Sequence, residues 1–126
     1  SMHRPGKICI EISEEQLPSD ILVLKEPLRR LRSAGAVLCV DDVGFGPSVL
    51  ESLILLEPEL VKFNRQHVQG VAHHVGKQRE IARLLSVIGN LGARAVAEGI
   101  DSPDDAARLR ELGVPLGQGF LWGQPQ

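Results

Sequence analysis

Two adjacent carboxylates, Asp41 and Asp42, end the apolar run AVLCV and are followed by the turn Gly44-Phe45-Gly46. A strand end is rigid enough to hold a metal ion or an acid/base pair, and glycines let the backbone approach a ligand closely. The same residues could instead begin a turn or cap the next helix. Taken alone, the pair leaves both interpretations open.

Other apolar runs end in the same way, each in a polar side chain: Glu11, Lys62, Glu98 and Gln118. Between these runs lie helical patterns that close on the residue favoured just past a helix C-terminus, namely Gly35, Gly92 and Gly113. Strands that alternate with helices form a parallel sheet with right-handed crossovers. Ligands bind such sheets at the carboxyl ends of the strands, where these polar side chains fall.

The apolar patterns predict strands over residues 7–12, 37–41, 60–63, 94–98 and 115–121. They predict helices over 48–55 and 78–91, a helix that ends near Ala34, and a helix that begins after the N-cap Ser102. In the 78–91 helix one apolar stripe is formed by Ile81, Leu84, Leu85 and Ile88.

Length and composition limit the number of domains and the classes of protein to which the chain can belong. A chain of 126 residues, 43% hydrophobic and with a formal net charge of −2, is expected to be one folded domain that offers no footprint for a nucleic-acid duplex. It contains no apolar stretch of the ~20 residues that a membrane span needs and no secretory signal, so we expect a cytoplasmic protein. Residues 1–6 are interpreted as a tag remnant or a disordered start, and residues 7–126 as the domain.

The two cysteines are expected to be structural. Cys9 and Cys39 each lie two residues before an acid, Glu11 or Asp41, and side chains two apart on a strand share a face. The thiols should therefore lie one layer below the acids, as small apolar fillers rather than as a disulfide. The adjacent histidines at positions 73 and 74 are expected to face solvent and not to bind metal.

The chain resembles the EAL domain, the cyclic di-GMP phosphodiesterase family, in five motifs that occur in order: IEIS, VDDVGFG, LVKFN, AVAEGID and LGQGF. The family's corresponding motifs are E-I/L-S/T-E, DDFGTGYSS, K-I/L-D, AEG-V/I-E and QG-Y/F, and the spacings also fit. The resemblance covers nearly the whole chain and corresponds to the C-terminal part of the family domain. It implies an α/β fold, a partial TIM-like (β/α) barrel with about five mainly parallel strands.

The resemblance also implies roles for the polar side chains. It makes Glu11, Asp41 and Asp42 ligands of Mg²⁺ or Mn²⁺, and it gives Lys62 and Glu98 catalytic roles in orienting the attacking water and in supporting the network around it. Substrate-binding or supporting roles fall to Asn64, Asp101 and Gln118. The implied reaction is hydrolysis of cyclic di-GMP to a linear dinucleotide, for which a metal pair activates water.

Several departures from the family pattern bear on activity. No EAL string occurs, and 126 residues can supply only part of a barrel that typically needs ~250. Asn64 replaces the acid of the third motif, Asp101 is one methylene shorter than the family's residue, and the loop after Asp42 reads VGFGPSVL. We therefore expect weak or absent metal binding and impaired catalysis, with a role in cyclic di-GMP signalling through binding or protein contacts.

Two other functions have to be compared with that of an impaired EAL-like domain. A longer native chain or a partner subunit could complete an active phosphodiesterase site. A phosphoacceptor receiver domain is excluded by order, because the acidic pair follows the second predicted strand and Lys62 precedes Glu98. A partial barrel exposes sheet edges and apolar surface, so we also expect a homo-oligomer or a complex with a partner protein.

Overall fold

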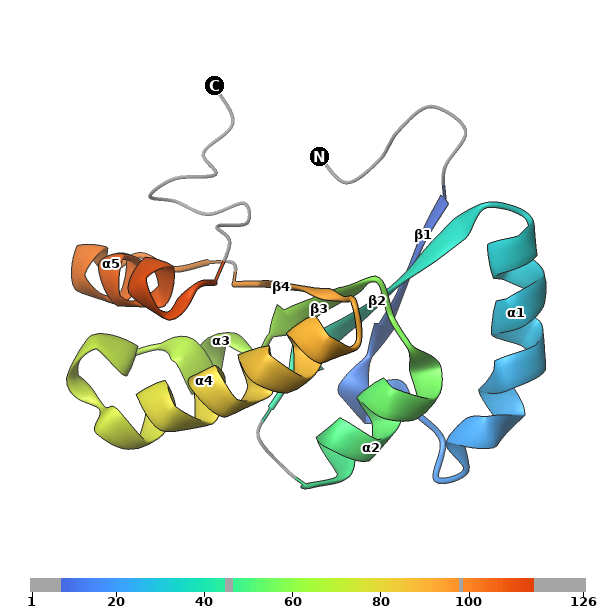
Figure 1. Cartoon of the computed structure of the whole chain (residues 1–126), viewed down its shortest axis with the longest axis horizontal. Helices are drawn as coiled ribbons and strands as arrows, with labels where there is room; N and C mark the ends of the chain where they lie inside the picture. Colours follow the sequence, from blue (N-terminus) through green and yellow to red (C-terminus); the bar gives the residue numbers. More distant parts are fainter. Residues whose placement is uncertain (1–7, 45–46, 98, 115–126) are drawn as a thin grey trace.

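The computed structural model describes residues 8–44, 47–97 and 99–114, and these contain a sheet of four parallel strands (Figure 1). The strands are β1 (Ile8–Ser13), β2 (Ala36–Val43), β3 (Leu60–Phe63) and β4 (Arg94–Val96), and their order in the sheet is β1-β2-β3-β4. All three neighbouring pairs are parallel. The predicted α/β class and the first four predicted strands are confirmed, and the fifth, at 115–121, lies outside the described residues.

Helices connect each strand to the next, as parallel pairing requires. The short η1 (Glu14–Gln16) follows β1, and η2 (Ile21–Leu24) with α1 (Lys25–Ser33) leads into β2. The next connection is α2 (Pro47–Leu56), and β3 is followed by α3 (Arg65–Val68), η3 (Val71–His73) and α4 (Val75–Asn90). After β4 comes α5 (Pro103–Leu112). No helix among the described residues is both long and apolar enough to cross a bilayer.

The helix boundaries follow local chemistry. The glycines expected to end helices, Gly35, Gly92 and Gly113, have φ values of 100°, 78° and 96°, a left-handed conformation that glycine adopts without steric cost. The predicted N-cap Ser102 accepts a hydrogen bond from the Asp105 backbone N–H at 3.3 Å. One helix begins earlier than predicted, because the His74 ring accepts from the Lys77 backbone N–H at 3.1 Å and caps α4.

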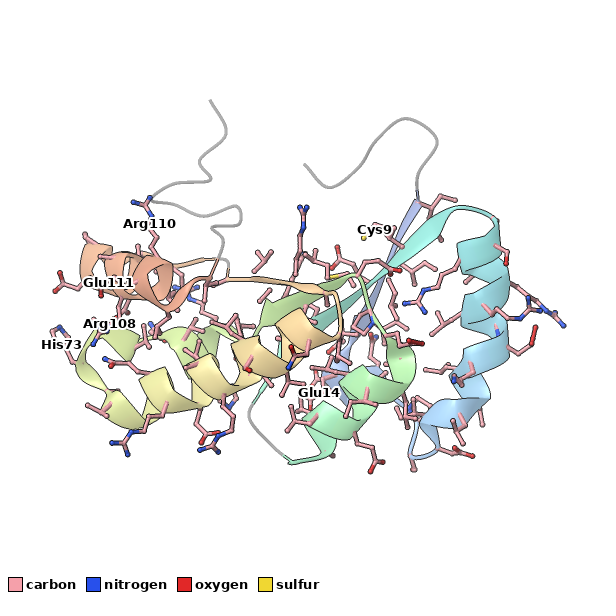
Figure 2. All side chains as sticks on the ribbon, viewed as in Figure 1. Cys9, Glu14, His73, Arg108, Arg110 and Glu111 are labelled. Carbon is pink, nitrogen blue, oxygen red and sulfur yellow. The ribbon has the colours of Figure 1, made fainter. Side chains whose placement is uncertain are left out.

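One core joins the helices to one face of the sheet. In α2 the residues spaced by four and three positions, Val49, Leu53 and Leu56, are at most 2% exposed. They share a cluster with the predicted stripe of α4 and with alternate strand residues such as Val40 and Val61. Cys39 and Leu60 are equally buried but lie outside this cluster, since their side chains belong to the opposite face. Figure 2 shows Cys9 on the side of the sheet away from α2.

A polar staple holds the amino ends of the strands. The Glu59 carboxylate accepts from the Leu38 backbone N–H at 2.7 Å and from the Arg32 guanidinium at 3.2 Å. Arg32, near the end of α1, also donates to the Glu57 carbonyl. The segment that leads into β3 is therefore tied to α1 and to β2, at the end of the sheet opposite the predicted site residues Asp41 and Lys62.

Glu57 adopts a strained backbone, and this leads to a prediction about stability. Its φ of +50° is the only positive value among the described non-glycine residues. Because a side chain disfavours this region, replacing Glu57 by Gly should raise the free energy of unfolding by about 0.5–1 kcal/mol in a denaturant titration. As a control, Glu51→Gly on the exposed side of α2 should lower it by about 1 kcal/mol. A loss of stability in Glu57→Gly would show that the turn carries no strain.

Candidate functional site

Polar side chains from three strands meet on the face of the sheet opposite the core. Lys62 of β3 places its Nζ 3.4 Å from both carboxylate oxygens of Glu11, which belongs to β1. Because β2 lies between these strands, the lysine side chain reaches across β2 to make this pair. Asp41 of β2 is half-buried, and its Cα partner on β1 is Ser13. The structure thus brings Glu11 and Lys62 together, with Asp41 on the strand between them.

The acidic pair coincides with an irregularity in the sheet. Val40 pairs with Val61 and Val43 with Phe63, so β2 advances three residues where β3 advances two. The extra residue makes a β-bulge at Asp41 and Asp42, a feature that bends a strand and redirects its side chains. Bulges are over-represented next to active sites, and this one is located where the sequence predicted metal ligands.

Glu14 and His67 support the backbone just after this bulge. The Glu14 carboxylate accepts from the Gly44 N–H at 3.0 Å, and the His67 ring packs so closely that a Cβ on Gly44 would lie 2.9 Å from its Cε1 atom. The absence of a side chain at Gly44 thus allows the close approach of the ring. Neither Glu14 nor His67 was a predicted site residue, although Glu14 directly follows the IEIS motif. Figure 2 shows Glu14 beneath the sheet, near α2.

Each cysteine lies one layer below the acid of its own strand, Cys9 below Glu11 and Cys39 below Asp41, and Cys39 is also the register partner of Glu11. Burial raises the pKa of the Cys39 thiol to about 12; the charge of Lys62 acts in the opposite direction, and that of Glu11 adds to the rise. Burial and the charge of Glu11 also raise the pKa of Cys9. Both cysteines are free; Cys39 is buried, as expected of a small apolar filler, whereas Cys9 is only partly buried. Neither is a thiolate ligand at neutral pH.

Asn64 caps a helix. Its side-chain Oδ1 accepts from the Gln66 backbone N–H at 2.8 Å and so satisfies a donor in the first turn of α3. Its backbone N–H donates to the Val43 carbonyl at 2.9 Å. The sequence predicts the loss of a charge at this position, and the structure adds a local role as a helix cap, which an amide fills well. Whether it also supports substrate stays a prediction.

Asp101 lies beyond β4 and pairs with Arg65, the first residue of α3, at 3.4 Å. Both side chains are more than half exposed, so the pair itself is weak. The structure therefore places Asp101 in contact with the β3–α3 connection rather than with the Glu11 carboxylate. Glu98, Gln118 and the side chain of Asp42 lie outside the described part of the chain, so their predicted roles stay predictions.

The described residues meet only part of what a metal pair needs. Among the side chains that the structure describes, no three of the His, Cys, Asp and Glu type are grouped closely enough to hold an ion. Glu11 and Asp41 are oxygen donors of the kind that Mg²⁺ and Mn²⁺ prefer. The described residues therefore match such ions in donor type and fall short in number.

Comparison with known proteins decides the family. The family model of the EAL domain matches residues 1–125. The chain belongs to the EAL domain family. A curated relative, the cyclic di-GMP phosphodiesterase RocR of Pseudomonas aeruginosa, is 33% identical over 121 residues, which are 96% of this chain and 31% of RocR. An uncharacterised protein of Azorhizobium caulinodans is 32% identical over 95% of the chain and 16% of its own length.

Solved EAL structures share the fold. BlrP1 of Klebsiella pneumoniae, in a complex with manganese and cyclic di-GMP, superposes with a TM-score of 0.79 and 28% identity over 89% of this chain and 29% of that one. A standalone EAL protein of Vibrio cholerae, bound to cyclic di-GMP, gives a TM-score of 0.80 with 25% identity over 94% and 50%. This EAL domain sequence thus spans at most half of these relatives, and its sheet corresponds to part of their barrel.

Proposed function

We propose that this EAL domain binds cyclic di-GMP at the carboxyl ends of β1, β2 and β3, and that the 126-residue chain alone does not hydrolyse it. The observation that carries the proposal is the placement of Lys62 against Glu11 across β2, next to the bulge at Asp41. At the carboxyl ends of neighbouring strands, carboxylates can bind divalent cations, and the cations together with a lysine can bind an anionic phosphodiester.

The relatives support the choice of ligand. RocR is a cyclic di-GMP phosphodiesterase by name, and the Klebsiella and Vibrio structures are cyclic di-GMP complexes. In this chain we propose that Glu11, Asp41 and Asp42 would hold Mg²⁺ or Mn²⁺ weakly, because few protein ligands leave the rest of the shell to water and substrate. A bound ion of this kind would supply an activated water and charge stabilisation. Lys62 would offset the negative charge of the phosphate.

A second candidate is a working phosphodiesterase whose site is completed by a longer native chain or by a partner subunit. The observation that favours it is that Glu11, Asp41 and Lys62 are present and that Lys62 and Glu11 are already paired. The solved EAL proteins are at least about twice as long as the matched region, so further strands could bring the missing ligands.

Calorimetry with cyclic di-GMP and Mg²⁺ tests the binding proposal. Replacing Lys62 by Met should weaken the Kd at least tenfold, because the variant loses a positive charge at the anionic ligand. The matched control is Lys25→Met on the exposed start of α1, which should leave the Kd unchanged. Absence of binding by the unmodified chain, or equal losses in the two variants, would contradict the proposal.

A further inference from the structure

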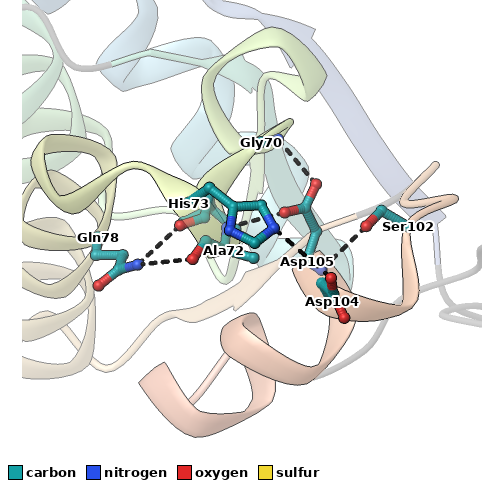
Figure 3. A network of polar contacts seen from close by, with 8 residues as sticks. Gly70, Ala72, His73, Gln78, Ser102, Asp104 and Asp105 are labelled. Atoms are coloured by element: carbon teal, nitrogen blue, oxygen red, sulfur yellow. Dashed lines mark hydrogen bonds and ion pairs between the residues drawn. The ribbon is translucent and has the colours of Figure 1, made fainter.

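The connections that follow β3 and β4 are tied together by a buried carboxylate. Asp105, in the first turn of α5, is 5% exposed and is the only buried charged residue in the described part of the chain. Its Oδ2 accepts from the Gly70 N–H at 2.8 Å and its Oδ1 from the Ala72 N–H at 2.9 Å (Figure 3). We call this pair of bonds the Asp105 clamp.

The clamp is built to be strong. Both bonds are charge-assisted, and such bonds are roughly twice as strong as neutral ones. They flank Val71, whose side chain is fully buried in the core, so the segment is held from both sides. Gly70 has a φ of +79°, which turns its N–H toward α5 at the start of η3.

A second layer extends the clamp to α4. Gln78 donates from its side-chain amide to the Val71 carbonyl at 2.9 Å and accepts from the Arg108 guanidinium at 3.1 Å. The network therefore includes η3, α4 and α5 (Figure 3). The ion pair of His73 with Asp104, at 3.6 Å, is mostly exposed and adds little.

The same two connections also meet through Arg65. Arg65 follows β3 and contacts the β4–α5 connection twice, through Asp101 at 3.4 Å and by lying over Gly99, where an added Cβ would meet its Cδ at 3.6 Å. These contacts are exposed or apolar and weak, whereas the Asp105 clamp is buried. The position of Asp101 relative to the β3–α3 connection therefore depends on two buried groups, the Asp105 clamp and the side chain of Ile100, which is 3% exposed in the core.

We infer that Asp105 is a positioning residue: it sets where the segment 99–101, and with it Asp101, lies relative to Lys62 and Arg65. The effect on ligand binding rests on the proposed function, while the coupling between the two connections does not. Asp105 touches no residue assigned to the site, and it acts through the backbone of Gly70 and Ala72 at one end and of α5 at the other.

The test replaces Asp105 by Asn, which removes the charge and one of the two acceptors. We expect hydrogen exchange of the 99–101 amides in the ligand-free protein to become at least tenfold faster, with exchange in the middle of α4 unchanged, and the Kd for cyclic di-GMP to weaken about fivefold or more. The matched control is Glu59→Gln, the same chemical change in a carboxylate that accepts a backbone N–H at the opposite end of the sheet. It should alter neither readout.

The outcomes separate the two claims. Unchanged exchange at 99–101 in Asp105→Asn, or an equal change in Glu59→Gln, overturns the inference. Faster exchange with an unchanged Kd overturns the role in binding. If the unmodified protein binds no cyclic di-GMP, the proposed function fails, and the exchange data still decide the coupling. Should Asp105→Asn not fold, Gln78→Leu, which removes only the second layer, should raise the same exchange by a smaller factor, and wild-type exchange there overturns the inference.

Discussion

The 126-residue chain, incubated with cyclic di-GMP and Mn²⁺, should form no linear dinucleotide above the protein-free rate. The described residues contribute two carboxylates and a lysine to the site, and half or more of each solved EAL protein compared above lies outside the match. A metal pair that is poorly held loses both the activated water and the charge stabilisation, and these losses act as a unit. A chain extended by the missing barrel strands should gain turnover by several orders of magnitude.

Restoring the family acid by Asn64→Asp should not rescue turnover in the short chain. The side chain at this position accepts from the Gln66 N–H and caps α3, and Asp is as good an N-cap as Asn. The new carboxylate should therefore stay on the helix end, with stability within about 0.5 kcal/mol of the original. Product chromatography decides the matter. Turnover by the unmodified chain that disappears in Asp41→Ala would favour a site completed between subunits.

The largest effect on stability is expected for Leu53→Ala. Leu53 is 1% exposed on the buried face of α2, and its removal should leave a cavity that lowers the free energy of unfolding by about 2–5 kcal/mol. The adjacent Ile54 is 52% exposed, so Ile54→Ala should change the free energy by about 0.5 kcal/mol or less. The contrast between neighbours tests which face of α2 covers the sheet.

Denaturant titration of both variants measures this contrast. Equal and large losses of unfolding free energy in Leu53→Ala and Ile54→Ala would show that α2 buries both faces, as in an assembly that covers the exposed side of the helix. Equal and small losses would show that α2 is not packed on the sheet at all. The homo-oligomer expected from the open sheet edges stays a prediction, and the first of these results would favour it.

Most of the framework could be predicted from sequence because it depends on short-range patterns. The strand at 60–63 and the stripe from Ile81 to Ile88 follow from apolar periodicity, and Gly113 and Ser102 mark helix ends by local geometry. The predicted start of α4 was wrong by three residues, because the side chain of His74 provides the N-cap. Such a cap has no strong sequence signal.

The site was predictable only in part. Glu11 and Lys62 were assigned to one site by their motifs, and the structure pairs them. The bulge at Asp41, the Glu14 contact to Gly44 and the Asp105 clamp depend on segments that meet only in the folded chain, so no local pattern announces them. Asn64 was misjudged in a different way. Comparison with the family motif indicated only the loss of a carboxylate, whereas the fold also uses the Asn64 amide to cap α3.

The order of the strands has a consequence for how the chain reaches this structure. Among the described residues, each strand pairs only with its neighbours in sequence, and partners such as Ile8 with Ala36 or Leu60 with Arg94 lie roughly 20–35 residues apart. Pairing strands that are adjacent in sequence closes shorter loops than any other strand order would, and the entropic cost of closure rises with loop length. We therefore expect vectorial folding during synthesis, in which each emerging β-strand docks on an edge that already exists.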